Sequence, residues 1–483
     1  MDCTSAPLRI CGGGLCEVPK LLHFYASLSR VSQAEGLVSE DIEQRAAKAV
    51  ALHSEGKLSE AEAAYRALLD EHADYPAVLH NLGVLLASSD RLAEAIQSFK
   101  DAVASDPNYV SAYWNGGKAL QQAGRYKEAA EFYERYIAIE PWDYEGRLLL
   151  GKLALRLGNR DKALDYFTQT MDMRRGDNRT NIVLDPSLLS TTRAKLQHDI
   201  DQFRYLATQK RDNERVNSLA RAYEFAMKRI DWPDDANEVV ELSADQLSLL
   251  GESYNFPNFI ADAAVSPEGT VNPDLKVEEI SHAFQTGTPG VAWFDDLLLP
   301  EALERLQRYL LSSTIWFDFS HIGGFLATYL EDGLACPLLL QIAEDIRAKF
   351  PAIFGDHPLA QAWAFKGLSG DVPIDVHADD AFVTVNFWVT PDSANLSPER
   401  GGLEVYTVLP PEDWAVKDYD EDKPAIRAFL EGQEDQKISI PYGQNRVVFF
   451  DSRLFHGSDS PNFADGYENN RINVTMLFGD RNV

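Results

Sequence analysis

The residues best suited to chemistry lie in the last quarter of the chain. His377 and Asp379 are two positions apart, and residues at that spacing in a β-strand point to the same side. An imidazole and a carboxylate placed in this way can bind one metal ion. His456, in the segment RVVFFDSRLFHGSDS, is the candidate for a third ligand. Such a set would leave further coordination positions of the ion open for reactants.

A basic residue follows the candidate ligands. Arg471 begins the last predicted strand, with Asn473 on the same face. The guanidinium group is shaped for a bidentate contact with a carboxylate, so Arg471 is a candidate for binding a carboxylate cosubstrate. Asn386 and Trp388 alternate on one face of the strand after His-x-Asp. If that face points inward, Asn386 is a polar contact to the cosubstrate, and Trp388 belongs either to the pocket wall or to the core.

The order of these motifs is more specific than any one of them. His377-x-Asp379 is followed by Gly401-Gly402-Leu403, then by Pro441…Arg446-Val-Val-Phe-Phe, His456 and Arg471, all within 95 residues. Two histidines and one carboxylate with open positions are the ligand set of non-haem Fe(II) oxygenases. Over about residues 289–483 the chain resembles the 2-oxoglutarate/Fe(II)-dependent dioxygenases.

The resemblance implies roles for these residues. His377, Asp379 and His456 would hold Fe(II), and Arg471 would pair with the distal carboxylate of 2-oxoglutarate. The cosubstrates would be 2-oxoglutarate and O2, with ascorbate as a supporting reductant, and the products would be succinate and a hydroxylated C–H. Asp379 favours hydroxylation, because halogenating members of the family replace that carboxylate with a small residue. The family's nucleic-acid demethylases carry a second arginine where Leu477 stands here, which argues against a nucleic-acid substrate.

Short strands must position these groups. Residues 291–314 read as a strand, a turn and an amphipathic helix. After Gln361 the pattern has period two in QAWAFKGL, AFVTVNFWVT, GLEVYTVL, KISIPY, RVVFFD and RINVTMLF. Strands separated by Gly, Pro and Asp turns predict an antiparallel double-sheet barrel of the jelly-roll or double-stranded β-helix class. Residues 407–440 form a long acidic insertion, either a lid over the substrate or a solvated face.

The first half of the chain is a repeat with a period of 34 residues. A small residue, an aromatic residue four positions later, and a glycine each recur in phase: Ala61, Ala95, Ala129 and Ala163; Tyr65, Phe99, Tyr133 and Phe167; Gly83, Gly117 and Gly151. The small residues allow two helices of one unit to approach closely, and the aromatic ring fills the space beside them. Over about residues 42–177 the chain resembles tetratricopeptide repeats, which predicts an all-α superhelix.

The geometry of that family implies a concave groove for a peptide. Trp114, Lys118, Lys152 and Arg156 should face it. Lys152 and Arg156 are four residues apart, so they share a helix face that suits a carboxylate. An ordinary solvated helix face fits the same pattern.

Length and composition support a multidomain chain. The 483 residues carry 45 Lys and Arg against 75 Asp and Glu, a formal net charge of −30, which disfavours nucleic acid or an anionic membrane as the main partner. No apolar run approaches the ~20 residues of a membrane span, and four cysteines are too few for a disulfide framework, so a cytoplasmic location is expected. We expect an N-terminal segment (1–41), four repeats (42–177), a helical connector (178–232), a linker (233–288) and the oxygenase domain (289–483).

The expected function is hydroxylation of a protein or peptide side chain presented by the repeats. One alternative keeps the enzyme but gives it a small metabolite as substrate, with the repeats used for assembly. Another is a non-catalytic interaction protein. The sequence leaves the substrate and the oligomeric state open.

Overall fold

The computed structural model describes residues 36–178, 186–209, 213–287, 290–320, 324–368, 373–415, 418–419 and 422–481. Most of the predicted N-terminal segment, with Cys3, Cys11 and Cys16, lies outside these ranges. The chain forms two compact units, one ending at Pro141 and one spanning Trp142–Arg481. Each unit is described by itself below.

The first unit consists of paired helices with the predicted 34-residue period. The predicted small residues are buried, and the turns within the three pairs contain Gly56, Asp90 and Gly124, each with a positive φ. The helices are α2 (Gly36–Ser54), α3 (Leu58–Glu71), α4 (Pro76–Ser88), α5 (Leu92–Ser105), α6 (Val110–Gln122) and α7 (Tyr126–Ile139).

Close packing explains why glycine recurs in these helices. A Cβ atom at Gly83 would lie 2.8 Å from the ring of Phe99, and one at Gly117 would lie 2.7 Å from the ring of Tyr133. Only glycine leaves room for the aromatic residue of the following helix. The turn glycine has a different reason, since Gly124 has a φ of +70° that side chains rarely adopt.

The fourth helix pair belongs to the second unit. α8 (Tyr144–Arg156) and α9 (Arg160–Arg175) contribute Leu155 and Phe167 to the same apolar core as the β-rich region. Arg174 of α9 pairs with the buried Asp332 at 2.8 Å. The predicted boundary after residue 177 therefore differs from the division of the structure, which falls after Pro141. Apolar residues on a repeat helix do not reveal which domain will cover them.

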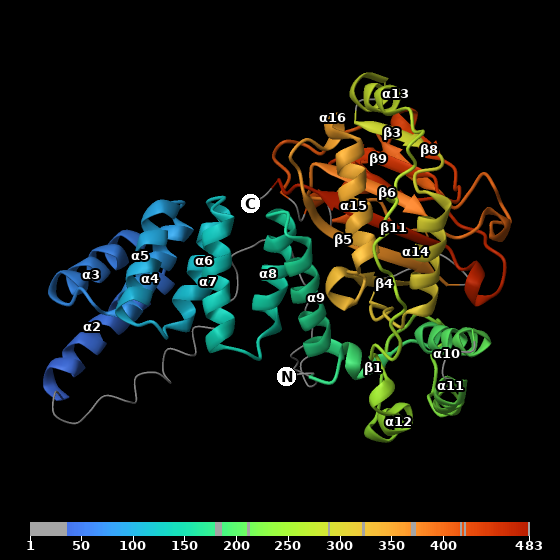
Figure 1. Ribbon diagram of the computed structural model, residues 1–483. Helices are drawn as coiled ribbons and strands as arrows, with labels where there is room; N and C mark the ends of the chain where they lie inside the picture. The colour runs from blue at the N-terminus through green and yellow to red at the C-terminus, as the bar shows by residue number, and fades with distance from the viewer. Residues whose placement is uncertain are drawn as a thin grey trace. The chain divides into compact units, whose positions relative to one another are not determined.

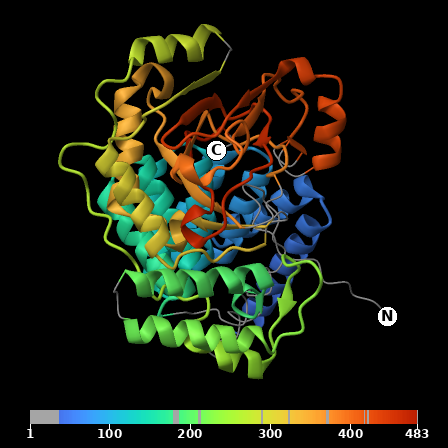
Figure 2. The same cartoon turned by 90° about the vertical axis from the view of Figure 1, so that its right-hand side faces the viewer.

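The connector is a small helical layer of the second unit. α10 (Arg193–Thr208) and α11 (Asn213–Met227) lie side by side (Figure 2) around their own apolar core. The predicted linker 233–288 contains α12 (Ala244–Leu250) and α13 (Val277–His282), and its Ala261 and Ala263 join the main core. Two short strands, β1 (Ser190–Thr191) and β2 (Val240–Glu241), pair antiparallel.

A six-stranded antiparallel sheet forms the centre of the β-rich region. Its order is β3-β9-β6-β11-β5-β4. The strands are β3 (Val291–Phe294), β4 (Phe325–Tyr329), β5 (Leu359–Gly367), β6 (Val383–Trp388), β9 (Val447–Asp451) and β11 (Ile472–Phe478). One face packs on α14 (Pro300–Ser312), α15 (Pro337–Lys349) and α16 (Pro351–Phe354), which cover it in Figure 1.

A smaller antiparallel sheet has the order β10-β7-β8. It comprises β7 (Leu403–Tyr406), β8 (Lys437–Ile440) and β10 (His456–Ser458). An apolar layer that includes Trp388 and Phe450 of the large sheet with Val405 and Ile440 of the small one joins the two. The predicted strands thus form antiparallel sheets. His377 and Asp379 lie outside the named strands, and His377 makes only a single bridge to His456.

Candidate metal centre and its pocket

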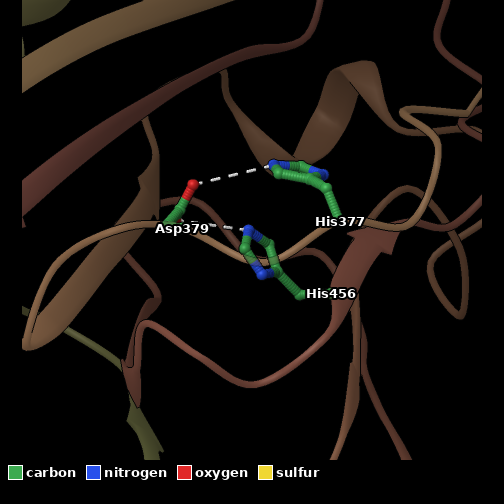
Figure 3. Close-up of side chains that lie close together, drawn as sticks. All are labelled: His377, Asp379 and His456. Carbon is green, nitrogen blue, oxygen red and sulfur yellow. Dashed lines mark ion pairs between the residues drawn. The ribbon is translucent and has the colours of Figure 1, made fainter. Parts of the chain in front are cut away.

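His377, Asp379 and His456 lie together. One ligand atom from each lies within 4.8 Å of the other two. In Figure 3 the carboxylate of Asp379 faces both imidazoles, with His377 Nε2 3.8 Å from Oδ1 and His456 Nε2 3.5 Å from Oδ2. Among the described residues this is the one group of three or more His, Cys, Asp or Glu side chains with metal-binding spacing.

The backbone sets which nitrogen of each imidazole faces the centre. His377 Nδ1 lies 2.9 Å from the carbonyl oxygen of Asp375, and His456 Nδ1 lies 3.0 Å from that of Leu454. A carbonyl only accepts hydrogen bonds, so each Nδ1 carries the proton and donates it. Each Nε2 therefore directs a lone pair toward Asp379, which is the arrangement of metal-binding histidines with backbone partners.

Burial keeps both imidazoles neutral. It lowers the pKa of His377 to about 4, with His456 as a further cause, and lowers the pKa of His456 to about 4. Burial also raises the pKa of the Asp379 carboxyl. Two neutral donors and one buried acid fit a divalent cation, because the cation would compensate the buried carboxylate and needs unprotonated ligands.

The carboxylate is oriented by a second pair of side chains. The hydroxyl of Thr384 on β6 donates to Asp379 Oδ2 at 2.9 Å. It lies 2.9 Å from the hydroxyl of Ser452, which can donate to it in turn. The backbone N–H of Asp379 also donates to the carbonyl of Ser452 at 2.8 Å. These bonds fix Asp379 although it lies outside a strand.

His377 and His456 line a pocket. Its walls come from both sheets: Trp363, Phe365, Ile374, His377, Asn386, Leu403, His456, Gly457, Ser458, Arg471, Asn473 and Thr475. The predicted residues Asn386, Arg471 and Asn473 thus share the pocket with the histidines. Asn386 and Asn473 lie on the neighbouring strands β6 and β11.

Arg471 is 5% exposed, and its guanidinium donates hydrogen bonds to three acceptors. Its Nε donates to the carbonyl of Gly401 at 2.7 Å, its Nη2 to that of Gly402 at 3.4 Å, and its Nη1 to Asn473 Oδ1 at 3.3 Å. A Cβ atom at Gly402 would lie 1.9 Å from the carbonyl oxygen of Ile440. The Gly-Gly pair is therefore needed to bring these carbonyls beside the arginine.

Two polar atoms in the pocket have no hydrogen-bond partner within the described part of the chain. They are the Asn386 carboxamide oxygen and the Trp363 indole nitrogen, both buried. Buried polar groups are normally paired, so these atoms fit a site that is completed by a polar ligand. Trp363 was missed from the sequence. Its signal was the alternation in QAWAFKG, which puts Trp363 and Phe365 on one face of β5.

Other predictions fare differently. Trp388 is fully buried between the two sheets and does not line the pocket, so of the two alternatives it belongs to the core. A further histidine, His357, stacks on Phe382 with ring centroids 4.0 Å apart and is not in the group of candidate ligands. The pocket lining contains no described residue of the acidic insertion.

The predicted groove residues are divided between the two units. On α6, Trp114 packs on Tyr136, with ring centroids 4.9 Å apart, and the Lys118 ammonium lies 5.0 Å from the Trp114 ring centre. On α8, Lys152 is half-buried, and Arg156 forms an ion pair with Asp480. The carboxylate beside Arg156 is thus one of the chain's own.

A tetratricopeptide-repeat family model matches residues 52–119 and 120–179. These residues are tetratricopeptide repeats. The matched residues include α3 to α9. No curated protein matches the chain.

Solved structures resemble the repeats. The crystal structure of MamA is 22% identical with a TM-score of 0.27, and the match covers 28% of this chain and 74% of that one. YrrB, a repeat protein with an unusual peptide-binding site, is 21% identical with a TM-score of 0.25, and the match covers 28% of this chain and 73% of that one. The first repeat domain of Spaghetti (RPAP3), bound to an HSP90 peptide, is 25% identical with a TM-score of 0.24, and the match covers 25% of this chain and 97% of that one. In the described ranges no helix has the length and apolarity to cross a bilayer.

Proposed function

We propose that the protein is an Fe(II)/2-oxoglutarate-dependent dioxygenase that hydroxylates an unactivated C–H. The observation that carries the proposal is the group His377, Asp379 and His456, in which both Nε2 atoms are directed at the carboxylate. The finer assignment of the two packed sheets as a jelly-roll, or double-stranded β-helix, belongs to the same proposal. It is supported by the antiparallel order of both sheets and the apolar layer between them.

The described residues suit this reaction. Fe(II) and 2-oxoglutarate, when bound, supply the chemistry by which R–H, O2 and 2-oxoglutarate become R–OH, succinate and CO2. His377, Asp379 and His456 would hold the metal on one side and leave the pocket side accessible. Arg471 would bind the distal carboxylate of 2-oxoglutarate through its planar guanidinium, and Asn386 and Asn473 would contact the cosubstrate from β6 and β11.

We propose a protein or peptide side chain as the substrate, recruited by the repeats. Tetratricopeptide repeats commonly present a concave surface to a peptide, and the Spaghetti domain is bound to one. The rival substrate is a small metabolite, which would enter the same pocket without help from the repeats. A non-catalytic interaction protein would use the repeats alone and would need no metal.

Succinate release tests the proposal. Purified protein would be loaded anaerobically with Fe(II) and 2-oxoglutarate and then exposed to O2, with His377→Ala as the matched variant. Slow uncoupled succinate formation that disappears in His377→Ala is expected. If the wild type binds neither Fe(II) nor 2-oxoglutarate, the enzyme assignment is wrong and the interaction protein remains.

A truncation separates the two substrate classes. The cut belongs after Pro141, because α8 and α9 contribute to the core of the second unit. Removal of residues 42–177 would expose that core and abolish activity for a trivial reason. The chain beginning at Trp142 should keep uncoupled turnover in either case. It should lose turnover of a peptide substrate, and a small-metabolite substrate would be turned over as before.

A further inference from the structure

The acidic insertion packs behind the candidate metal ligands. Its described part comprises residues 407–415, 418–419 and 422–440. It includes α18 (Lys423–Leu430), an amphipathic helix whose Ile426 and Leu430 are buried. These two side chains form a separate apolar cluster with Tyr419, Ala378 and Phe455. The cluster contains no residue that lines the pocket.

The two residues outside the insertion each adjoin a ligand. Ala378 lies between His377 and Asp379, and Phe455 immediately precedes His456; both are fully buried. Neighbouring residues of an extended chain point to opposite sides. His377 and His456 line the pocket, whereas Ala378 and Phe455 pack in the insertion cluster. The rings of Phe429 and Phe455 have centroids 5.7 Å apart.

Polar contacts tie the same segments together. The N–H of Ala378 donates to the carbonyl of Tyr419 at 3.0 Å. Arg427 of α18 pairs with the carboxylate of Asp375, whose carbonyl accepts the Nδ1–H of His377. The ion pair is exposed, with Arg427 65% and Asp375 39% accessible, so it contributes little. The buried packing and the backbone bond are the main contacts.

We propose that the insertion is a brace for the metal centre and not a lid over the substrate. Ile426, Tyr419 and Phe455 are positioning residues that hold both ligand-bearing segments in register. This inference rests on the proposed metal site. If the docked insertion favours the metal-binding geometry, then metal binding must favour the docked insertion by the same factor, because coupling between two binding equilibria is reciprocal.

A matched pair of core deletions tests the brace. Ile426→Ala removes three carbons from a fully buried side chain in the insertion cluster, and Ile346→Ala does the same on α15 in the main core. Both should lower the thermal midpoint, since each leaves a cavity. Only Ile426→Ala should weaken binding of Co(II), used as a spectroscopic probe, by tenfold or more in an absorption titration. It should also change the shape of the Co(II) ligand-field bands.

The reciprocal measurement uses the unaltered protein. On addition of Co(II), backbone amides of 422–430 and of 376–379 should exchange with deuterium more slowly, and those of α14 should not change. This exchange measurement tests the brace even if Ile426→Ala fails to fold, because it uses the wild-type protein. The brace is wrong if Ile426→Ala binds Co(II) like the wild type, if Ile346→Ala weakens binding equally, or if 422–430 gains no protection. If the wild type binds no Co(II), the proposed metal site itself is wrong.

Discussion

His377 and His456 form a reciprocal backbone pair. The N–H of His377 donates to the carbonyl of His456 at 3.0 Å, and the N–H of His456 donates to that of His377 at 2.7 Å. Their ring centroids are 4.4 Å apart. Two candidate ligands that are 79 residues apart in sequence (456 − 377) are therefore adjacent in the fold.

The hydroxyl of Thr384 should matter for the metal. Thr384→Val keeps the shape of the side chain but removes the donor to Asp379 Oδ2. Loss of such an orienting bond typically costs 10–100-fold in metal affinity, so a Co(II) titration should show a shift of that order. Thr328→Val is the control, because the buried Thr328 hydroxyl has no hydrogen-bond partner among the described residues. Equal Co(II) affinities for the two variants would contradict the role of Thr384.

Arg471 should set the affinity for 2-oxoglutarate. Arg471→Lys keeps the positive charge but loses the planar fork, and the dissociation constant of 2-oxoglutarate from the Co(II) protein should rise by about 10–100-fold, or about 1.4–2.8 kcal/mol. Co(II) affinity without 2-oxoglutarate should stay the same. Arg453→Lys, at a side chain that is 40% exposed and paired with Asp451, should leave both unchanged. A normal 2-oxoglutarate affinity in Arg471→Lys would exclude the assigned contact.

The indole N–H of Trp363 should donate to the bound ligand. Trp363→Phe removes that donor and leaves an aromatic wall. A hydrogen bond to a charged group contributes about 1.5–3 kcal/mol, so 2-oxoglutarate should bind roughly tenfold or more weakly. The quenching of tryptophan fluorescence by the ligand should also shrink. Trp293→Phe, at a residue that is 47% exposed on β3, should change neither the affinity nor the quenching. Unaltered 2-oxoglutarate binding by Trp363→Phe would contradict the proposed hydrogen bond.

Close packing in the repeats should be sensitive to one methyl group. Gly117→Ala would place a Cβ atom 2.7 Å from the Tyr133 ring, and overpacking of this kind costs about 1–3 kcal/mol. Calorimetry should show a lower midpoint for the first unit and an unchanged Co(II) affinity. Gly124→Ala meets no atom within 4 Å but has a φ of +70°, so it should cost about 1–2 kcal/mol through the backbone alone. A Gly117→Ala protein as stable as the wild type would argue against the described packing.

Lowering the pH should reduce the stability of the second unit, because His198 is buried in its neutral form. Burial lowers the pKa of this imidazole to about 3, and the nearby Lys366 is a further cause. The unfolded chain binds a proton near pH 6.5, whereas the folded chain does so only near pH 3. The free energy of unfolding therefore falls as the pH drops below 6.5, by about 1.4 kcal/mol per unit and about 2 kcal/mol at pH 5.

The comparison with His198→Gln isolates that effect. The other groups that face His198 include Asp199 and Lys195 as well as Lys366, and they remain in both proteins. Calorimetric midpoints at pH 5, 6 and 7 should decline less steeply for the variant. Parallel declines would show that His198 takes up its proton in the folded state.

The repeats and the strands could be predicted because their signals are local. A 34-residue period predicted the buried alanines, and two-residue alternation located β5, β6 and β11. The side-chain set around His377 was found because residue types with few structural uses recurred in a fixed order.

What the sequence did not reveal depends on contacts between distant segments. The sequence of 407–440 contains no signal that Ile426 packs in one cluster with Ala378. The sequence of α9 likewise does not indicate that Phe167 shares a core with the β-rich region. The position of Trp363 needed the register between β5 and β11, which pairs Trp363 with Thr475. Long-range register is set by the whole fold, and a period of two cannot supply it.

The division after Pro141 has a consequence for the evolution and engineering of such a chain. The described helices before that point contribute no residue to the core around the pocket, so they can be added, lost or exchanged without opening it. The helix pair α8 and α9 lacks this freedom, because Arg174 is tied to Asp332 and Phe167 is shared with the β-rich region. This repeat pair is a fixed part of the second unit.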